Sequence, residues 1–125
     1  MIWIIWHLFI AIDILTHWYI IERLHKSPNK VLATVWRAAV CVGLGLAFGF
    51  ENTAQIIVYL IGCGSTFVLF FNTGLNKARG KELHHLGSGP VDKLLALIPS
   101  FGFRIFMLVV ISAGMIHAYY NTDLL

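Results

Sequence analysis

Three residues near the amino terminus have types and spacing that could do chemistry. Asp13 lies near the middle of the apolar run 1–21, and His17 follows it by four residues, on the same face of a helix. An ionised acid at the centre of a membrane span costs about 2.5 to 3.5 kcal/mol on insertion scales, so such residues are functional candidates. If the next helix folds back antiparallel, Arg37 reaches the depth of Asp13, and a buried ion pair becomes available.

Two interpretations of this group stay open. In one, Asp13, His17 and Arg37 form a proton path or a polar lock between helices. In the other, Arg37 extends to the lipid headgroups while Asp13 is protonated or bonded to a neighbouring helix.

Two other histidines suggest a cofactor. His7 and His117 lie in the first and last apolar runs, toward the same side, and two axial ligands on facing helices would hold a b-type haem. No helix repeats the histidine spacing of stacked haems, and a single histidine often serves hydrogen bonding alone. We therefore expect no cofactor.

Metal and catalytic sites are also not expected. Glu82, His84 and His85 lie together without a downstream cysteine or carboxylate pair, which matches no closed metal site. The run 87–90 lacks the Lys and the Ser or Thr of a phosphate-binding loop. Because no nucleophile, base and acid stand in a catalytic context, we expect no catalytic residues and no enzyme.

The composition indicates that membrane-spanning helices position these residues. Hydrophobic residues make up 58% of the chain and charged residues 12%, with a mean hydropathy of +0.79. Such a chain is too apolar for a water-soluble domain. This excludes a disulfide scaffold, a disordered segment, a cytosolic enzyme and, despite a net charge of +3, a nucleic-acid-binding protein.

The apolar runs predict one all-α domain over residues 1–125 with four transmembrane helices. A bilayer core of about 30 Å needs about 20 helical residues. The runs 1–21, 31–50, 54–75 and 101–120 meet this length, and the first has no basic residue before it, unlike a signal peptide. Ser27 and Pro28 predict the start of the second helix. The spacing of apolar residues in 90–98 predicts a short helix lying flat among the headgroups.

The basic residues predict the orientation, because all of them flank the first and third connections: Arg23, Lys26, Lys30, Arg37, Lys77, Arg79, Lys81, Lys93 and Arg104. Neither terminus nor the turn near Asn52 has a Lys or Arg. The positive-inside rule then places both termini outside and the basic loops in the cytoplasm. These loops also predict binding of anionic lipid headgroups, at about 1 kcal/mol per residue.

Small residues predict where helices approach closely. In the second and third spans they include Gly43, Gly45, Gly49 and Gly62. Lipid gives no hydrophobic drive for helix association, so small residues favour contact, and we expect these two helices to touch. The Gly45 and Gly49 pair suits contact within the chain or between copies. Cys41 and Cys63 are equally distant from Asn52 and should lie at matched depth, unbridged.

One loop carries a family resemblance. The run RGKELHHLG at 79–87, followed by Asp92 and Lys93, resembles a loop of small uncharacterised membrane proteins encoded by phages and prophages of Bacteroidetes-type bacteria. His84 and His85 stand where those proteins have an aromatic pair. The resemblance implies a viral gene product in the bacterial cytoplasmic membrane or an internal viral (virion) membrane, and it implies no activity.

Three functions remain as hypotheses. A structural or assembly role, with a homo-oligomer or a membrane-protein partner, requires little beyond the predicted architecture. A holin-like oligomeric pore former would need a sustained polar stripe and often a densely charged tail, whereas the tail here has one charge. A haem- or proton-handling membrane subunit would depend on Asp13, His17, His7 and His117.

Overall fold

The described part of the chain is helical. The structure, a computed structural model, describes residues 1–82, 90–98 and 100–121. The elements are α1 (Ile2–Trp18), a π-helical turn that extends it (Tyr19–Arg23), α2 (Lys30–Phe48), α3 (Thr53–Ala78), α4 (Pro90–Ala96) and α5 (Phe101–Tyr120). No strand occurs within these ranges.

Four of the helices are long and apolar enough to cross a membrane. They are Ile2–Arg23, Lys30–Phe48, Thr53–Ala78 and Phe101–Tyr120, with 22, 19, 26 and 20 residues. At a rise of about 1.5 Å per residue, each is long enough to cross a hydrocarbon core of about 30 Å. The predicted spans agree with these helices to within three residues at each end, and the all-helical fold class is confirmed.

Side-chain caps define where three helices start. Asn29, and not the predicted Ser27 and Pro28, caps α2, because its Oδ1 accepts a hydrogen bond of 3.0 Å from Leu32 N. Asn52 caps α3 through Gln55 N, and Ser100 caps α5 through Phe103 N. Each cap supplies an acceptor to an amide that has no partner within its helix.

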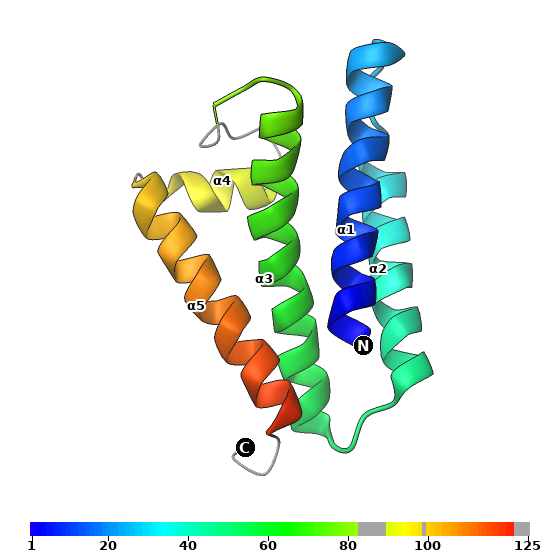
Figure 1. Cartoon of the computed structure of the whole chain (residues 1–125), viewed down its shortest axis with the longest axis vertical. Coiled ribbons are helices and arrows are strands. Elements are labelled where there is room, and N and C mark those ends of the chain that lie inside the picture. Colours follow the sequence, from blue (N-terminus) through cyan, green and yellow to red (C-terminus); the bar gives the residue numbers. More distant parts are fainter. Residues whose placement is uncertain (83–89, 99, 122–125) are drawn as a thin grey trace.

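The helices are arranged around α3. Figure 1 shows α1 on one side of α3 and α5 on the other, with α2 alongside α1 and α4 lying crosswise at the upper end. The most extensive contacts join α3 to α5, followed by those of α3 with α1. The predicted contact between α2 and α3 is present but small. Only 6% of the residues in the apolar stretch of α2 are buried.

The core lies where α1, α3 and the end of α5 meet. It consists of Ile2, Trp3, Trp6, Ile10, Val58, Tyr59, Cys63, Phe71 and Tyr119. Trp3 stands edge-on to Tyr119, with ring centroids 5.6 Å apart, and Trp6 Nε1 donates a 3.1 Å hydrogen bond to Thr66 Oγ1. Large aromatic side chains thus fill the core at this end of the bundle. Toward the end where α4 lies, α3 and α5 diverge (Figure 1).

Candidate functional site

Asp13 and Arg37 form an ion pair between α1 and α2. The Asp13 side chain is 6% exposed, and its Oδ2 accepts a 2.7 Å hydrogen bond from Arg37 Nε. The antiparallel fold of α2 against α1 brings the two residues to one level. The sequence left open whether Arg37 pairs with Asp13 or extends to the lipid headgroups. In the structure, the Arg37 guanidinium contacts Asp13.

His17 completes the polar cluster, defined here as Asp13, His17 and Arg37. Its Nε2 lies 3.1 Å from Arg37 Nη2, and its Nδ1 lies 2.9 Å from the Asp13 carbonyl oxygen and 3.3 Å from Asp13 Oδ1. A guanidinium has no acceptor, so Nε2 must accept from Arg37, and Nδ1 then carries the proton and donates to Asp13. The contacts therefore select the neutral, Nδ1-protonated form of His17.

Two aromatic rings of α3 cover the arginine. The guanidinium carbon of Arg37 lies 4.6 Å from the centroid of the Phe67 ring and 4.5 Å from that of Phe71. The two rings stack on each other at 4.8 Å, and His17 meets the edge of Phe71 at 5.1 Å. Cation–π attraction strengthens when water is excluded, so these rings bind α3 to the ion pair. The cluster thereby joins three helices.

Sequence reasoning missed Phe67 and Phe71. They are four residues apart in the third span, a spacing that places both on one face of a helix. That spacing was available as a signal, but many apolar residues of this span share it. Thr16, the neighbour of His17 in the sequence, is exposed, and its hydroxyl donates to the Ile12 carbonyl oxygen of its own helix.

The four glycines predicted to pack helices fall into two groups. A Cβ on Gly62 would lie 2.6 Å from Trp3 Cη2, and one on Gly45 would lie 2.6 Å from Phe50 Cζ, so an added methyl group at either site would have to displace an aromatic ring. At Gly43 and Gly49 a Cβ would meet no described residue within 4 Å, so their packing role stays a prediction. Gly49 ends α2, with φ at +74°.

A close approach at Gly74 was also missed. A Cβ there would lie 2.7 Å from Ile14 Cδ1, where α1 crosses the far end of α3. The partner of Gly74 is a residue sixty positions away, so nothing local in the sequence marks this contact.

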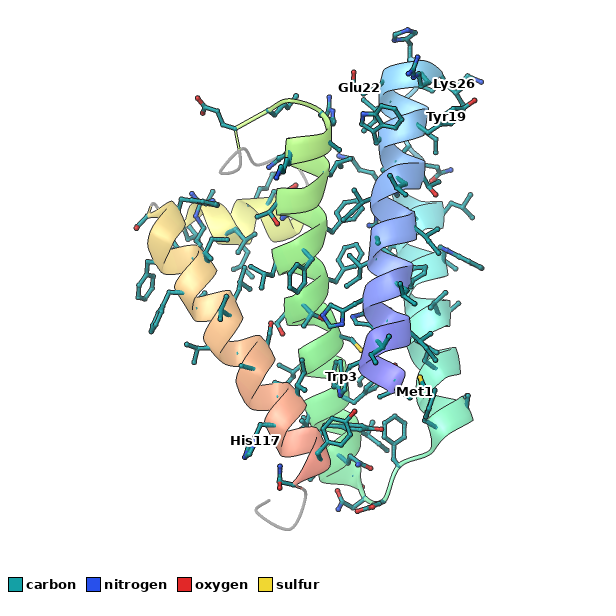
Figure 2. The ribbon with its side chains drawn as sticks, in the orientation of Figure 1. Met1, Trp3, Tyr19, Glu22, Lys26 and His117 are labelled. Atoms are coloured by element: carbon teal, nitrogen blue, oxygen red, sulfur yellow. The ribbon has the colours of Figure 1, made fainter. Side chains whose placement is uncertain are left out.

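The proposed haem ligands have other contacts. His7 Nδ1 lies 2.6 Å from the Trp3 carbonyl oxygen, and its ring meets the edge of Phe70. His117 is exposed on α5, where Figure 2 labels it, and it lies beside Asn121. Neither set of contacts brings His7 and His117 together as a pair of haem ligands.

The remaining candidates are less informative. Cys41 on α2 and Cys63 on α3 are both free thiols, without a disulfide. Glu82 is exposed, whereas His84 and His85 lie outside the described residues. Across the described ranges, no group of three or more His, Cys, Asp or Glu side chains is placed to hold a metal ion.

Comparisons with known proteins add no relative. No protein family, no curated protein and no solved structure matches the chain. The functional argument therefore depends on the residues of this chain.

Proposed function

We propose that this chain is an integral membrane protein with a structural or assembly role, in which α1, α2, α3 and α5 cross the bilayer. The polar cluster carries this proposal. An acid in the centre of a span is tolerated when it is paired, and Asp13 has both an arginine and a histidine as partners. The pairing uses the polar groups of α1 and α2 to hold helices together.

The outward surface of the bundle supports membrane insertion. Ile4, Leu8, Ile12 and Leu15 of α1 are each at least 60% exposed and follow one face of the helix. On α2, Val31, Leu32, Val35, Trp36, Val42 and Leu46 are similarly exposed. Water would oppose so large an apolar surface, whereas lipid tails solvate it.

The two ends of the bundle support the orientation. In Figure 2, Lys26 and Tyr19 lie at one end, and Met1 and His117 lie at the other. We place the basic end in the cytoplasm and both termini outside, by the positive-inside rule. Leu94 and Leu97 are 66% and 77% exposed beside Lys93, which favours α4 as a helix in the headgroup layer that binds anionic lipids.

The proposed setting follows from the loop resemblance. We place the protein, as a phage-encoded product without enzymatic activity, in the bacterial cytoplasmic membrane or an internal viral membrane. A second copy or another membrane protein is the expected partner. Gly43 supports this, because a Cβ there would meet nothing, so a helix of a partner has room to approach α2 closely.

A proton-handling role is the second candidate, and it is favoured by one observation. His17 bridges Asp13 and Arg37 through both ring nitrogens, and an imidazole can accept a proton on one nitrogen and release one from the other. A proton relay would pass through this ring, whereas a polar lock needs only its hydrogen bonds.

A vesicle experiment tests these roles. The purified protein is reconstituted into vesicles of phosphatidylethanolamine and phosphatidylglycerol that contain a fluorescent dye and a pH indicator. The structural role predicts dye retention and proton leakage equal to that of protein-free vesicles. Dye release would instead indicate a pore. Proton flux without dye release, lost in a folded His17→Phe variant, would indicate proton handling.

Two further measurements test the assembly role and the orientation. Protein extracted from its native membrane should have a fixed stoichiometry, with itself or with one partner, and a dispersed monomer would contradict assembly. Tags at both chain ends should be cleaved by a protease added outside intact cells. Cleavage of one tag only would overturn the orientation.

A further inference from the structure

A pocket lies at the end of the bundle opposite the basic loops. It has a volume of about 430 Å³ and is lined by the carboxyl end of α2, the turn that follows, the start of α3 and the end of α5. The lining residues used below are Phe48, Phe50, Glu51, Gln55, Tyr119 and Tyr120, which we call the aromatic pocket. This volume is within the range of small-molecule sites and accommodates a ligand of several heavy atoms.

One buried side chain holds the walls of the aromatic pocket together. Gln55 is 7% exposed, and its Nε2 donates a 3.0 Å hydrogen bond to the Tyr119 carbonyl oxygen. Its Oε1 accepts a 2.7 Å hydrogen bond from Glu51 N. The turn before α3 is thereby tied to the end of α5, so the pocket is formed in advance of any ligand.

The rings are held in place by the core. Phe50 packs against Tyr59 with ring centroids 5.3 Å apart, and Tyr119 stands edge-on to Trp3 at 5.6 Å. Tyr120 stands edge-on to Tyr119 at 5.1 Å and is 60% exposed at the rim. Aromatic faces attract cations, and rings fixed in this way lose little freedom when one binds.

The charges around the aromatic pocket favour a cation. Among the described residues that line the pocket, Glu51 is the only charged one, and the sequence contains no Lys or Arg in residues 38–76 or after Arg104. Two helices, α2 and α5, end at the pocket, and the carboxyl end of a helix carries partial negative charge. One helix, α3, begins there, and its Gln55 amide is already bonded to Asn52.

We propose that the aromatic pocket binds an organic ammonium group of the ethanolamine and choline class. The ammonium would lie between the rings and the Glu51 carboxylate, and the remainder of the ligand would extend past Tyr120. Phosphatidylethanolamine headgroups and free amines share this chemistry. Only the lipid form of the inference rests on the proposed membrane insertion, because a free amine reaches the pocket of the detergent-solubilised protein as well.

Titration of the full chain in a non-ionic detergent with choline and with ethanolamine tests the proposal, followed by tryptophan fluorescence and calorimetry. Saturable binding of at least one probe is expected. Glu51→Gln should weaken it about tenfold, and Tyr120→Leu about threefold to tenfold. Tyr120 is exposed, so its variant remains informative if Glu51→Gln does not fold.

Two control variants distinguish the pocket from general effects. Glu22→Gln removes an acid at the opposite end, and Phe106→Leu removes an exposed ring from the same helix as Tyr120; both should bind the probes as the native chain does. No saturation by either probe at about 50 mM, or equal weakening by the control variants, would overturn the proposal.

The source of the ammonium group is decided by lipid retention. Native mass spectrometry after extraction from mixed vesicles measures whether phosphatidylethanolamine is kept in preference to phosphatidylglycerol. Preferential retention that is lost in Tyr120→Leu identifies a lipid ligand. Binding of choline or ethanolamine without such retention identifies a soluble amine, and it leaves the proposed membrane role to the vesicle experiment.

Discussion

The two sides of α3 are held by different forces. Toward α1 and α2, the contact depends on the charged cluster of Asp13, His17 and Arg37, covered by two phenylalanines. Toward α5, the contact depends on a hydrogen bond of 3.1 Å between Ser112 and Ser65 and on close approach at Gly62. A Cβ added at Gly62 would lie 3.2 Å from Met115 Cβ of α5 and also 2.6 Å from Trp3 Cη2 of α1. Lipid gives neither side a hydrophobic drive, so one side uses strong polar pairing and the other uses close approach. The substitutions below separate the two.

Removing the arginine should have the largest effect. Arg37→Met leaves the Asp13 carboxylate buried without its main partner, so we expect the free energy of unfolding to fall by about 3 kcal/mol or more. Unfolding by denaturant in detergent micelles measures this. The double variant Asp13→Leu and Arg37→Met should recover most of the loss, because two apolar side chains then replace the pair. A single variant as stable as the native chain would show that the pair holds nothing together.

Adding a methyl group at Gly62, where α1 and α5 both approach α3, should have a smaller effect. A Cβ at Gly62 would lie 2.6 Å from Trp3 Cη2 and 3.2 Å from Met115 Cβ, so Gly62→Ala must displace a ring. We expect a loss of about 1 to 3 kcal/mol in the same unfolding assay. Gly64→Ala is the matched control on α3, since a Cβ there meets nothing within 4 Å. Equal losses at both positions would indicate a helix effect without crowding.

A single hydrogen bond between α3 and α5 should contribute less again. Ser112→Ala removes the donor to Ser65, whose own hydroxyl donates to the Gly62 carbonyl oxygen 3.2 Å away. Hydrogen bonds between membrane helices average about 0.6 kcal/mol, and we expect a loss of that size. A double-mutant cycle with Ser65→Ala isolates the pair. A coupling above about 2 kcal/mol would contradict the view that close approach dominates this side.

The exposed ion pair should have the smallest effect. Arg79 Nε lies 3.0 Å from Glu22 Oε1, but the side chains are 23% and 40% exposed. We expect Glu22→Gln to change the free energy of unfolding by less than about 1 kcal/mol, and less at high salt. The two arginines are similarly exposed, so the difference comes from the carboxylates, 6% exposed for Asp13 and 40% for Glu22. The partners His17, Phe67 and Phe71 of the first pair add to it. A loss as large as that of Arg37→Met would remove this distinction.

Periodicity and charge predicted much of the fold and part of the cluster. The apolar runs gave the four helices to within three residues, because helix length is tied to bilayer thickness. The spacing of Asp13 and His17, with an antiparallel second helix, pointed to Arg37. The caps were harder, since Ser27, Pro28 and Asn29 all suit a helix start, and only the hydrogen bond of Asn29 to Leu32 distinguishes them.

By itself, the sequence determined that the chain is apolar, helical and long enough for four crossings, since these properties depend on composition and on neighbours along the chain. The tertiary structure decided which helices meet. It placed α3 at the centre, set Phe67 and Phe71 over Arg37, and left no described residue within 4 Å of a Cβ added at Gly43. These contacts join residues that are distant in sequence, and helices that are apolar on every face do not mark in advance which face will be covered.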